Sequence, residues 1–243
     1  MILALTVAVA LQGAPVLKQA VAEEATVSLQ GDKIHYVGEL TRKGVDQVAA
    51  LLEANSDVNT LAINSGGGEI GMGIDLGLLV HQHQLDVHVT DGICMSSCAN
   101  YVFPAGRRKV IEPRTVVVWH GSAIQEGLFD FDKINMAFFR DAYGRDMNWI
   151  ERAVFRWKAW KYARMVKHRQ RDFYQLIGVD PEVTVYGQLR GCKCQWTFLP
   201  TDMATFGIDN VTAYPGYGTP GGNATFTEWK LLKVQDDNEV SVP

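Results

Sequence analysis

Between residues 34 and 120, short apolar stretches of two periodicities alternate, and this alternation constrains the fold more than any other feature of the sequence. Strand-like stretches lie at 34–40, 58–63, 85–90, 109–111 and 115–119, and helix-like stretches separate them at 41–55, 70–80 and 96–105. Strands that alternate with helices are typical of α/β folds with largely parallel sheets. We therefore predict the α/β class, with a strand pair at 27–38 and a turn at Asp91-Gly92.

The stretch after the glycines at 66–68 fits two structures. Its apolar residues alternate, which taken alone indicates a strand. However, Gly73 and Gly77 would weaken a strand, and Ile70, Ile74 and Leu78 form one helical stripe. We therefore predict a helix here.

The first 22 residues differ from the rest of the chain. The run from Ile2 to Leu11 is apolar and uncharged, and Ala20-Val21-Ala22 before Glu23 has the form that a signal peptidase accepts. The run is shorter than the roughly 20 residues of a membrane-spanning helix. We predict a signal peptide at 1–22 and a periplasmic or secreted protein; the alternative is an N-terminal strand or buried helix. The main domain is then 23–214, with a Gly/Pro linker and tail at 215–243.

Charge is unevenly distributed along the chain. The whole sequence carries 23 Lys and Arg against 27 Asp and Glu, a net charge of -4, which argues against a nucleic-acid partner. Residues 129–178 read as a basic helical insertion, and residues 140–171 alone carry +7 with interleaved tryptophans. Such a face fits an anionic membrane surface or an acidic partner. The alternative is a solvated helical hairpin whose aromatic residues pack on the domain.

Three segments could together supply the groups that acyl transfer requires: a nucleophile, a base and backbone N–H donors. Ser96 follows a strand and a glycine-containing turn and would open a helix, where N–H groups are free. His120 ends a strand, where functional residues gather in α/β folds. Gly67 and Gly68 have no side chains, so their N–H groups can approach a bound carbonyl closely.

The order and spacing of these segments resemble the Clp protease proteolytic subunit family, within the wider Clp/crotonase fold of repeated β-β-α units. The family's "Asn-Ser-Pro-Gly-Gly" turn corresponds to Asn64–Gly68, with Gly66 where proline is usual, and its "Gly-x-x-x-Ser" turn to Gly92–Ser96. The base corresponds to His120. Residues 105–108 resemble the "Ala-Gly-x-x-Arg" motif, one residue tighter, and residues 198–209 resemble the family's closing segment. The resemblance covers about residues 33–125 and 196–211.

The resemblance implies an exported serine peptidase without a cofactor, acting on a peptide or protein, and a homo-oligomer. Ser96 would be the nucleophile and His120 the base, with an oxyanion hole from Gly67, Gly68 and Ser97. The alternative function is an inactive Clp-like module that binds a peptide or partner protein at the same site.

The third catalytic residue of the family has no counterpart in this sequence. Residues 191–196, where the family carries an aspartate, contain no carboxylate. Either Ser96 and His120 work as a dyad, or Asp172 or Asp180 has taken the acid's place, or the site is not hydrolytic.

The cysteines form two close pairs, which suits disulfides in an exported protein. Cys94 and Cys98 bracket Ser96, and a bridge between them would rigidify its turn; cross-links to Cys192 or Cys194 are equally allowed. Zinc bound by four thiolates is the rival interpretation. The histidines at 81, 83 and 88 do not share a helix face, so we predict a surface cluster and no metal site.

Overall fold

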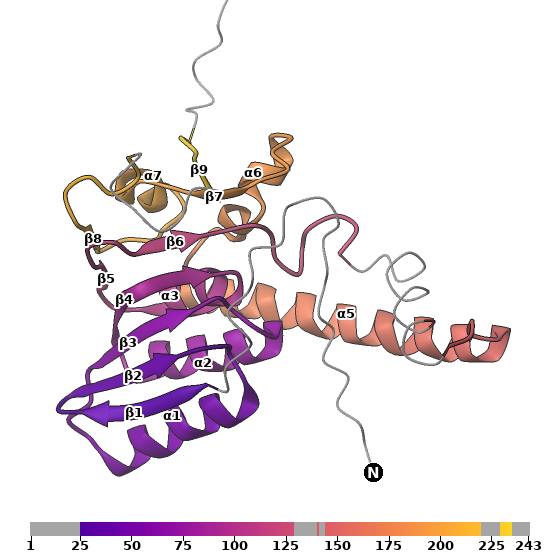
Figure 1. Cartoon of the computed structure of the whole chain (residues 1–243), viewed down its shortest axis with the longest axis horizontal. Helices are drawn as coiled ribbons and strands as arrows, with labels where there is room; N and C mark the ends of the chain where they lie inside the picture. Colours follow the sequence, from indigo (N-terminus) through magenta and orange to yellow (C-terminus); the bar gives the residue numbers. More distant parts are fainter. Residues whose placement is uncertain (1–24, 129–139, 141–143, 220–228, 235–243) are drawn as a thin grey trace, which may run out of the picture.

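A seven-stranded sheet runs through the described part of the chain, which in this computed structural model comprises residues 25–128, 140, 144–219 and 229–234. Its strands are β1 (Thr26–Gln30), β2 (Lys33–Val37), β3 (Thr60–Ser65), β4 (Asp86–Met95), β5 (Lys109–Ile111), β6 (Val116–Val118) and β8 (Val211–Ala213). They lie in the order β1-β2-β3-β4-β5-β8, with β6 paired to β4 (Figure 1). β1 and β2 form an antiparallel hairpin and the later pairs are parallel, which confirms the predicted α/β class.

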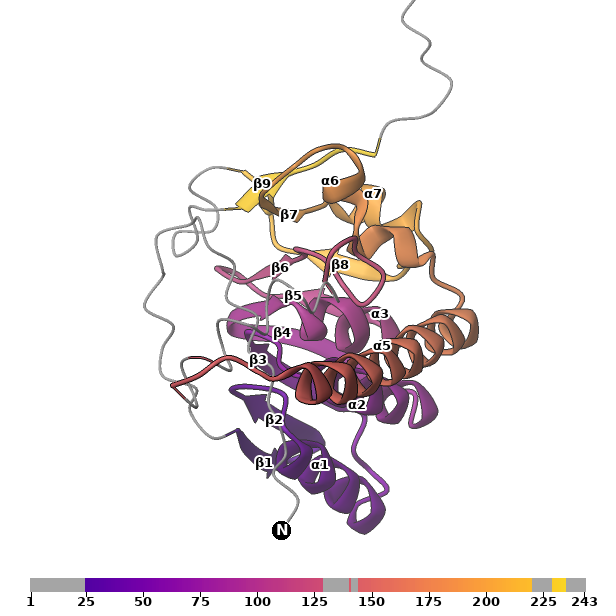
Figure 2. The same cartoon turned by 90° about the vertical axis from the view of Figure 1, so that its right-hand side faces the viewer.

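The helices lie between the strands in the predicted order. They are α1 (Arg42–Ala54), α2 (Ile70–Gln82), the π-helix η1 (Cys98–Val102), α3 (Phe103–Ala105), α5 (Trp149–Ile177), the 3₁₀-helix η2 (Pro181–Thr184), α6 (Tyr186–Leu189) and α7 (Pro200–Ala204). α1 contacts α2, and α2 in turn contacts η1 and α5 (Figure 2). The predicted signal peptide lies outside the described residues.

The glycines of α2 are needed for close packing. A Cβ on Gly77 would lie 2.4 Å from the carbonyl oxygen of Tyr101, and one on Gly73 would lie 2.8 Å from Cβ of Ser97. α2 therefore lies directly against the segment that follows β4. This contact explains why glycines occur in a helix, where they are otherwise unfavourable.

The turn that we predicted at Asp91-Gly92 is wrong, because β4 continues through it to Met95. Asp91 has a φ of 53°, and the pairing of β3 with β4 shifts register at this point. The Asn64 side chain spans the irregularity: its Nδ2 donates to the Asp91 carbonyl (3.0 Å), and its Oδ1 accepts from the Ile93 N–H (3.1 Å). A partner from another strand thus satisfies the backbone groups that the irregularity leaves unpaired.

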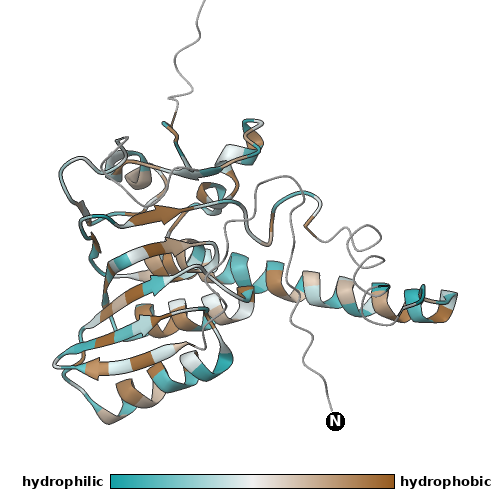
Figure 3. Cartoon of the chain, in the orientation of Figure 1, coloured by the Kyte–Doolittle hydropathy of each residue, from teal (hydrophilic) through white to brown (hydrophobic). Residues whose placement is uncertain are grey.

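The C-terminal part of the described chain packs on the sheet through aromatic residues. β7 (Gln195–Thr197) pairs in parallel with β9 (Trp229–Leu231), which lies within the predicted tail. The Trp119 ring lies 5.6 Å from that of Phe198, and both are fully buried. Tyr217, in the predicted linker, is also buried and shares a 2.7 Å hydrogen bond with Thr197. Apolar segments recur along the strands and α2 (Figure 3).

α5 is the longest helix of the described chain, at 29 residues. At 1.5 Å per residue it is about 43 Å long, and it extends well beyond the sheet (Figure 1). Asn148 and Glu151 form a capping box at its start, and Gly178 ends it at a φ of 70°. We predicted a helical stretch over residues 129–178. Its described part is a single helix from Trp149, preceded by non-helical residues at 144–148. Most of residues 129–143 lie outside the described residues.

Candidate active site

Ser96 lies on a strained turn between β4 and η1. Its N–H donates to the Val118 carbonyl (3.2 Å), and its own carbonyl accepts from the Asn100 N–H (2.8 Å). Its φ is 59°, a left-handed conformation that is uncommon for a residue with a side chain and that concentrates at functional sites. The side chain is partly exposed. A strained strand-to-helix turn is also how hydrolases present a nucleophilic serine.

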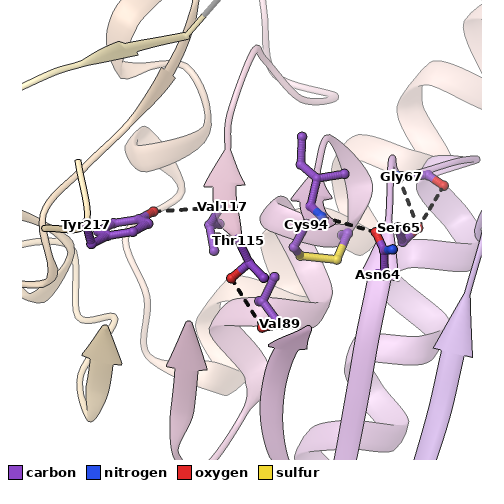
Figure 4. The surroundings of a disulfide bond; sticks show 10 residues. Asn64, Ser65, Gly67, Val89, Cys94, Thr115, Val117 and Tyr217 are labelled. Carbon is purple, nitrogen blue, oxygen red and sulfur yellow. Dashed lines mark hydrogen bonds between the residues drawn. A yellow bond between two sulfur atoms is a disulfide. The ribbon is translucent and has the colours of Figure 1, made fainter. Parts of the chain in front are cut away.

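A disulfide between Cys94 and Cys98 brackets this turn, and both cysteines are fully buried (Figure 4). Cys94 pairs with Ser65 of β3, so the bridge also lies beside the glycine loop. Cys192 and Cys194 form the second disulfide. Each cysteine is therefore bonded to its near neighbour, and neither the cross-links between pairs nor the four-thiolate zinc site is formed.

The glycine loop after β3 lies against Ser96. A Cβ on Gly67 would lie 2.6 Å from Cβ of Ser96 and 3.0 Å from the Ser97 nitrogen. The Gly67 N–H donates to Ser65 Oγ (3.1 Å), so it is already occupied, and the Ser97 hydroxyl donates to the Gly68 carbonyl (2.8 Å). Within the described ranges, the N–H groups of Gly68 and Ser97 donate to no protein acceptor. These two are the available donors for an oxyanion.

His120 follows β6, which pairs with the end of β4. Met95 at the end of β4 pairs with Val118 at the end of β6. Ser96 follows Met95 directly, and His120 comes two residues after Val118, so both residues follow neighbouring strand ends. Burial lowers the pKa of His120, and a hydrogen bond to its own backbone carbonyl opposes the shift. No hydrogen bond links Ser96 Oγ to the imidazole in the described part of the chain; such bonds are often long before substrate binds.

Asp172 and Asp180 are engaged away from His120. Asp172 is exposed on α5 and pairs with His168 at 2.7 Å. Asp180 caps η2 by accepting from the Glu182 N–H at 2.8 Å. Among the described residues, no carboxylate is hydrogen-bonded to the His120 imidazole or ion-paired with it. Neither aspartate therefore serves as the third member in this structure.

Two carboxamides contact the His120 segment, and sequence reasoning missed both. Gln188 Nε2 donates to the His120 carbonyl (3.0 Å), and Asn100 Nδ2 donates to the Gly121 carbonyl (2.8 Å). Asn100 is buried, and its Oδ1 has no partner within the described chain. An unpaired buried acceptor costs about 1–3 kcal/mol. No local signal identifies these residues, because the bond from Gln188 spans 68 positions.

The histidines predicted as a surface cluster form no metal site with other groups in the described ranges. His88 lies 3.7 Å from Glu112.

The N-terminal half of α5 presents an aromatic and basic face. Trp149, Trp157 and Trp160 are 79%, 58% and 54% exposed. Lys161 lies over the Trp157 ring at 5.4 Å, and Arg164 over Trp160 at 4.8 Å. α5 lacks the apolar length that crossing a membrane requires, as do the other described helices.

No family model matches the chain, and no curated protein is similar to it. Among solved structures, a mutant ClpP1 from Listeria monocytogenes is 21% identical with a TM-score of 0.33, over 47% of this chain and 74% of that one. A methylmalonyl-CoA decarboxylase complexed with 2S-carboxypropyl-CoA (6%, TM-score 0.30) and an enoyl-CoA hydratase from Mycobacterium avium subsp. paratuberculosis (14%, TM-score 0.31) each match over 38% of this chain. The chain spans about half the length of these two proteins, at 48% and 46%. With TM-scores of 0.30 to 0.33, these similarities assign no function to this chain.

Proposed function

We propose that this chain is an exported serine hydrolase that cleaves peptide bonds by acyl transfer, with Ser96 as the nucleophile and His120 as the base. The observation that carries the proposal is the strained turn of Ser96 at the end of β4. β4 pairs with β6, and His120 follows β6. We assign peptide bonds as the substrate because the sequence resembles Clp proteolytic subunits.

The reaction would proceed in two halves. His120 takes the proton of Ser96 Oγ as the oxygen attacks the substrate carbonyl, and the N–H groups of Gly68 and Ser97 stabilise the resulting oxyanion. His120 then gives the proton to the leaving amine as the C–N bond breaks, which leaves an acyl-Ser96 ester. In the second half His120 deprotonates a water molecule, whose attack releases the acid and restores the hydroxyl of Ser96.

Labelling with a fluorophosphonate, which reacts with activated serines, tests this proposal. We expect Ser96 to be labelled far faster than free serine, and peptide mapping should place the adduct on Ser96. Ser96→Ala should abolish labelling, and His120→Ala should slow it at least a hundredfold, as general-base catalysis typically contributes 10²–10⁴. Equal rates for wild type and His120→Ala would overturn the proposal.

The second candidate is an inactive module that binds a peptide or partner protein at the same site. The absence of a carboxylate partner for His120 among the described residues favours it. A wild-type protein that is inert to fluorophosphonate but binds peptides, with affinity lowered by Gly67→Ala, would identify this module.

Export depends on the signal sequence. We propose that residues 1–22 are removed, so intact-mass analysis of protein from the native host should give a chain beginning at Glu23. Retention of Met1 in the cytoplasm would contradict it. A homo-oligomer also stays a prediction, which sedimentation velocity would test.

We also propose that the aromatic and basic face of α5 contacts an anionic membrane surface. The support is the combination of exposed tryptophans with cations stacked on them, which suits the interface between headgroups and acyl chains.

A further inference from the structure

Two consecutive carbonyls, those of His120 and Gly121, each accept a hydrogen bond from a side-chain carboxamide. The donors are Gln188 Nε2 at 3.0 Å and Asn100 Nδ2 at 2.8 Å. We infer that Gln188 and Asn100 are positioning residues that hold the main chain at His120. In a catalytic triad a carboxylate orients the imidazole directly; here these two carboxamides orient it through the backbone. This inference rests on the proposed function.

The orientation of the His120 ring depends on its main chain. In a triad, a carboxylate on the second ring nitrogen sets the orientation and tautomer of the imidazole. Here no charged side chain of the described residues interacts with the imidazole, and burial lowers its pKa. The ring is carried by the main chain of His120, whose carbonyl is the acceptor of Gln188. A displacement of this carbonyl would therefore displace the ring.

Asn100 joins the segment after His120 to the turn of Ser96. Its backbone N–H donates to the Ser96 carbonyl (2.8 Å), while its side chain holds the Gly121 carbonyl. Its own carbonyl accepts from the Tyr174 hydroxyl (2.5 Å), which connects it to α5. A single buried residue thus contacts both the nucleophile's turn and the segment that follows the base.

The short helix α6, which carries Gln188, is closely packed. A Cβ on its neighbour Gly187 would lie 2.6 Å from the ring of Trp196, so α6 lies tightly on that side chain. Trp196 and Trp119 exchange two backbone hydrogen bonds of 2.8 and 2.9 Å. Trp119, His120 and Gly121 are therefore fixed in succession by Trp196, Gln188 and Asn100.

The test compares fluorophosphonate labelling of full-length wild type with Gln188→Met, which retains side-chain length but cannot donate. We expect labelling to slow at least tenfold. We also expect the midpoint of the rate against pH to rise toward the ordinary value of His, because a released ring becomes more solvated. A purely structural role would not move this midpoint. Asn100→Leu, which keeps a similar volume and adds no charge but loses the donor, should act in the same direction.

The matched control is Asn55→Ala, which removes a 2.8 Å bond from a carboxamide to the Leu51 carbonyl at the C-terminal end of α1. It should label at the wild-type rate. Suppose that the wild type is labelled, and that Gln188→Met is labelled at a rate within twofold of wild type with an unchanged pH midpoint. That result would overturn this inference but not the proposed function. An inert wild type would instead overturn the proposed function. If Asn100→Leu does not fold, Gln188→Met decides the inference by itself.

Discussion

Gly67 and Ser96 are in direct contact: a Cβ on Gly67 would lie 2.6 Å from Cβ of Ser96 and 2.8 Å from the Met95 carbonyl oxygen. Gly67 also has a φ of 103°, which side chains rarely tolerate. Gly67→Ala should therefore displace the nucleophile's turn and lower the fluorophosphonate labelling rate at least tenfold.

The adjacent glycine provides the control for this substitution. A Cβ on Gly66 would meet no atom within 4 Å, and its φ is not in the left-handed region. Gly66→Ala should label within twofold of wild type. Equal labelling by Gly67→Ala and wild type would show that the glycine loop does not limit the position of Ser96.

The pH dependence of labelling should report the environment of His120. Burial lowers its pKa, so the imidazole stays neutral, and able to accept a proton, to a lower pH than an ordinary histidine. The labelling rate measured from pH 4.5 to 8 should therefore have its midpoint below 6.5. A midpoint above 6.5 would instead indicate a carboxylate that stabilises the imidazolium.

The disulfide around Ser96 should affect both stability and reactivity. It closes a loop of about five residues, for which chain entropy gives about 2 kcal/mol. Cys94→Ala with Cys98→Ala should lower the free energy of unfolding by about that amount, measured by urea denaturation. It should also slow labelling several-fold, because the left-handed turn of Ser96 loses its restraint.

The second disulfide is the matched control. Removing Cys192 and Cys194 together should leave the labelling rate of Ser96 unchanged. Alkylation of the unfolded, unreduced wild type should modify no cysteine, and reduction should expose four. If the variant without Cys94 and Cys98 were labelled at the wild-type rate, the disulfide would not be needed to hold Ser96 in its reactive conformation.

Asp86 should stabilise the fold above acidic pH. Burial alone would raise its pKa, but hydrogen bonds from Arg107 (2.9 Å) and Arg108 (2.5 Å) outweigh it and hold the pKa at about 2. Because the folded pKa lies below the unfolded value of 3.8, the stabilisation is full above that value and is lost as the pH falls toward 2. Asp86→Asn should lower the free energy of unfolding at pH 7 by about 2 kcal/mol and flatten this part of the pH profile.

Asp57→Asn is the control for this variant, because Asp57 is exposed and contacts only the Ser56 hydroxyl, at 3.5 Å, among the described groups. Its stability should match wild type throughout. Parallel pH profiles for Asp86→Asn and wild type between pH 4 and 2 would contradict the assignment.

Binding of the α5 face to anionic lipid should depend on both charge and aromatic contact. Reversing the charge at Arg156, Lys158, Lys161 and Arg164 should abolish sedimentation with vesicles that contain phosphatidylserine. Wild-type binding should weaken with salt, because exposed charges are screened over about 10 Å at 0.1 M.

Trp157→Ala with Trp160→Ala should also weaken this binding while the charge is retained. Vesicles of phosphatidylcholine alone are the control and should sediment little protein. Absence of wild-type binding at low salt would leave α5 as a solvated helix or a contact for an acidic protein.

Local patterns in the sequence were enough to predict much of the sheet and its helices. The predicted helix-like stretch at 41–55 begins at Thr41, and the side chain of Thr41 caps α1 by accepting from the Gly44 N–H. The helical stripe at Ile70, Ile74 and Leu78 correctly outweighed the alternation of apolar residues. Such features depend on neighbours a few positions apart, so periodicity and capping residues reveal them.

The tertiary structure decided the features that depend on distant partners. Asp91-Gly92 has the composition of a turn, yet β4 continues because the Asn64 side chain satisfies its backbone groups. Likewise, the residue types near position 190 do not distinguish Gln188, because its partner is the main-chain carbonyl of His120. Every residue has a backbone carbonyl, so the sequence does not show which carbonyl a side chain will bind. Only the folded chain shows which side chains hold His120.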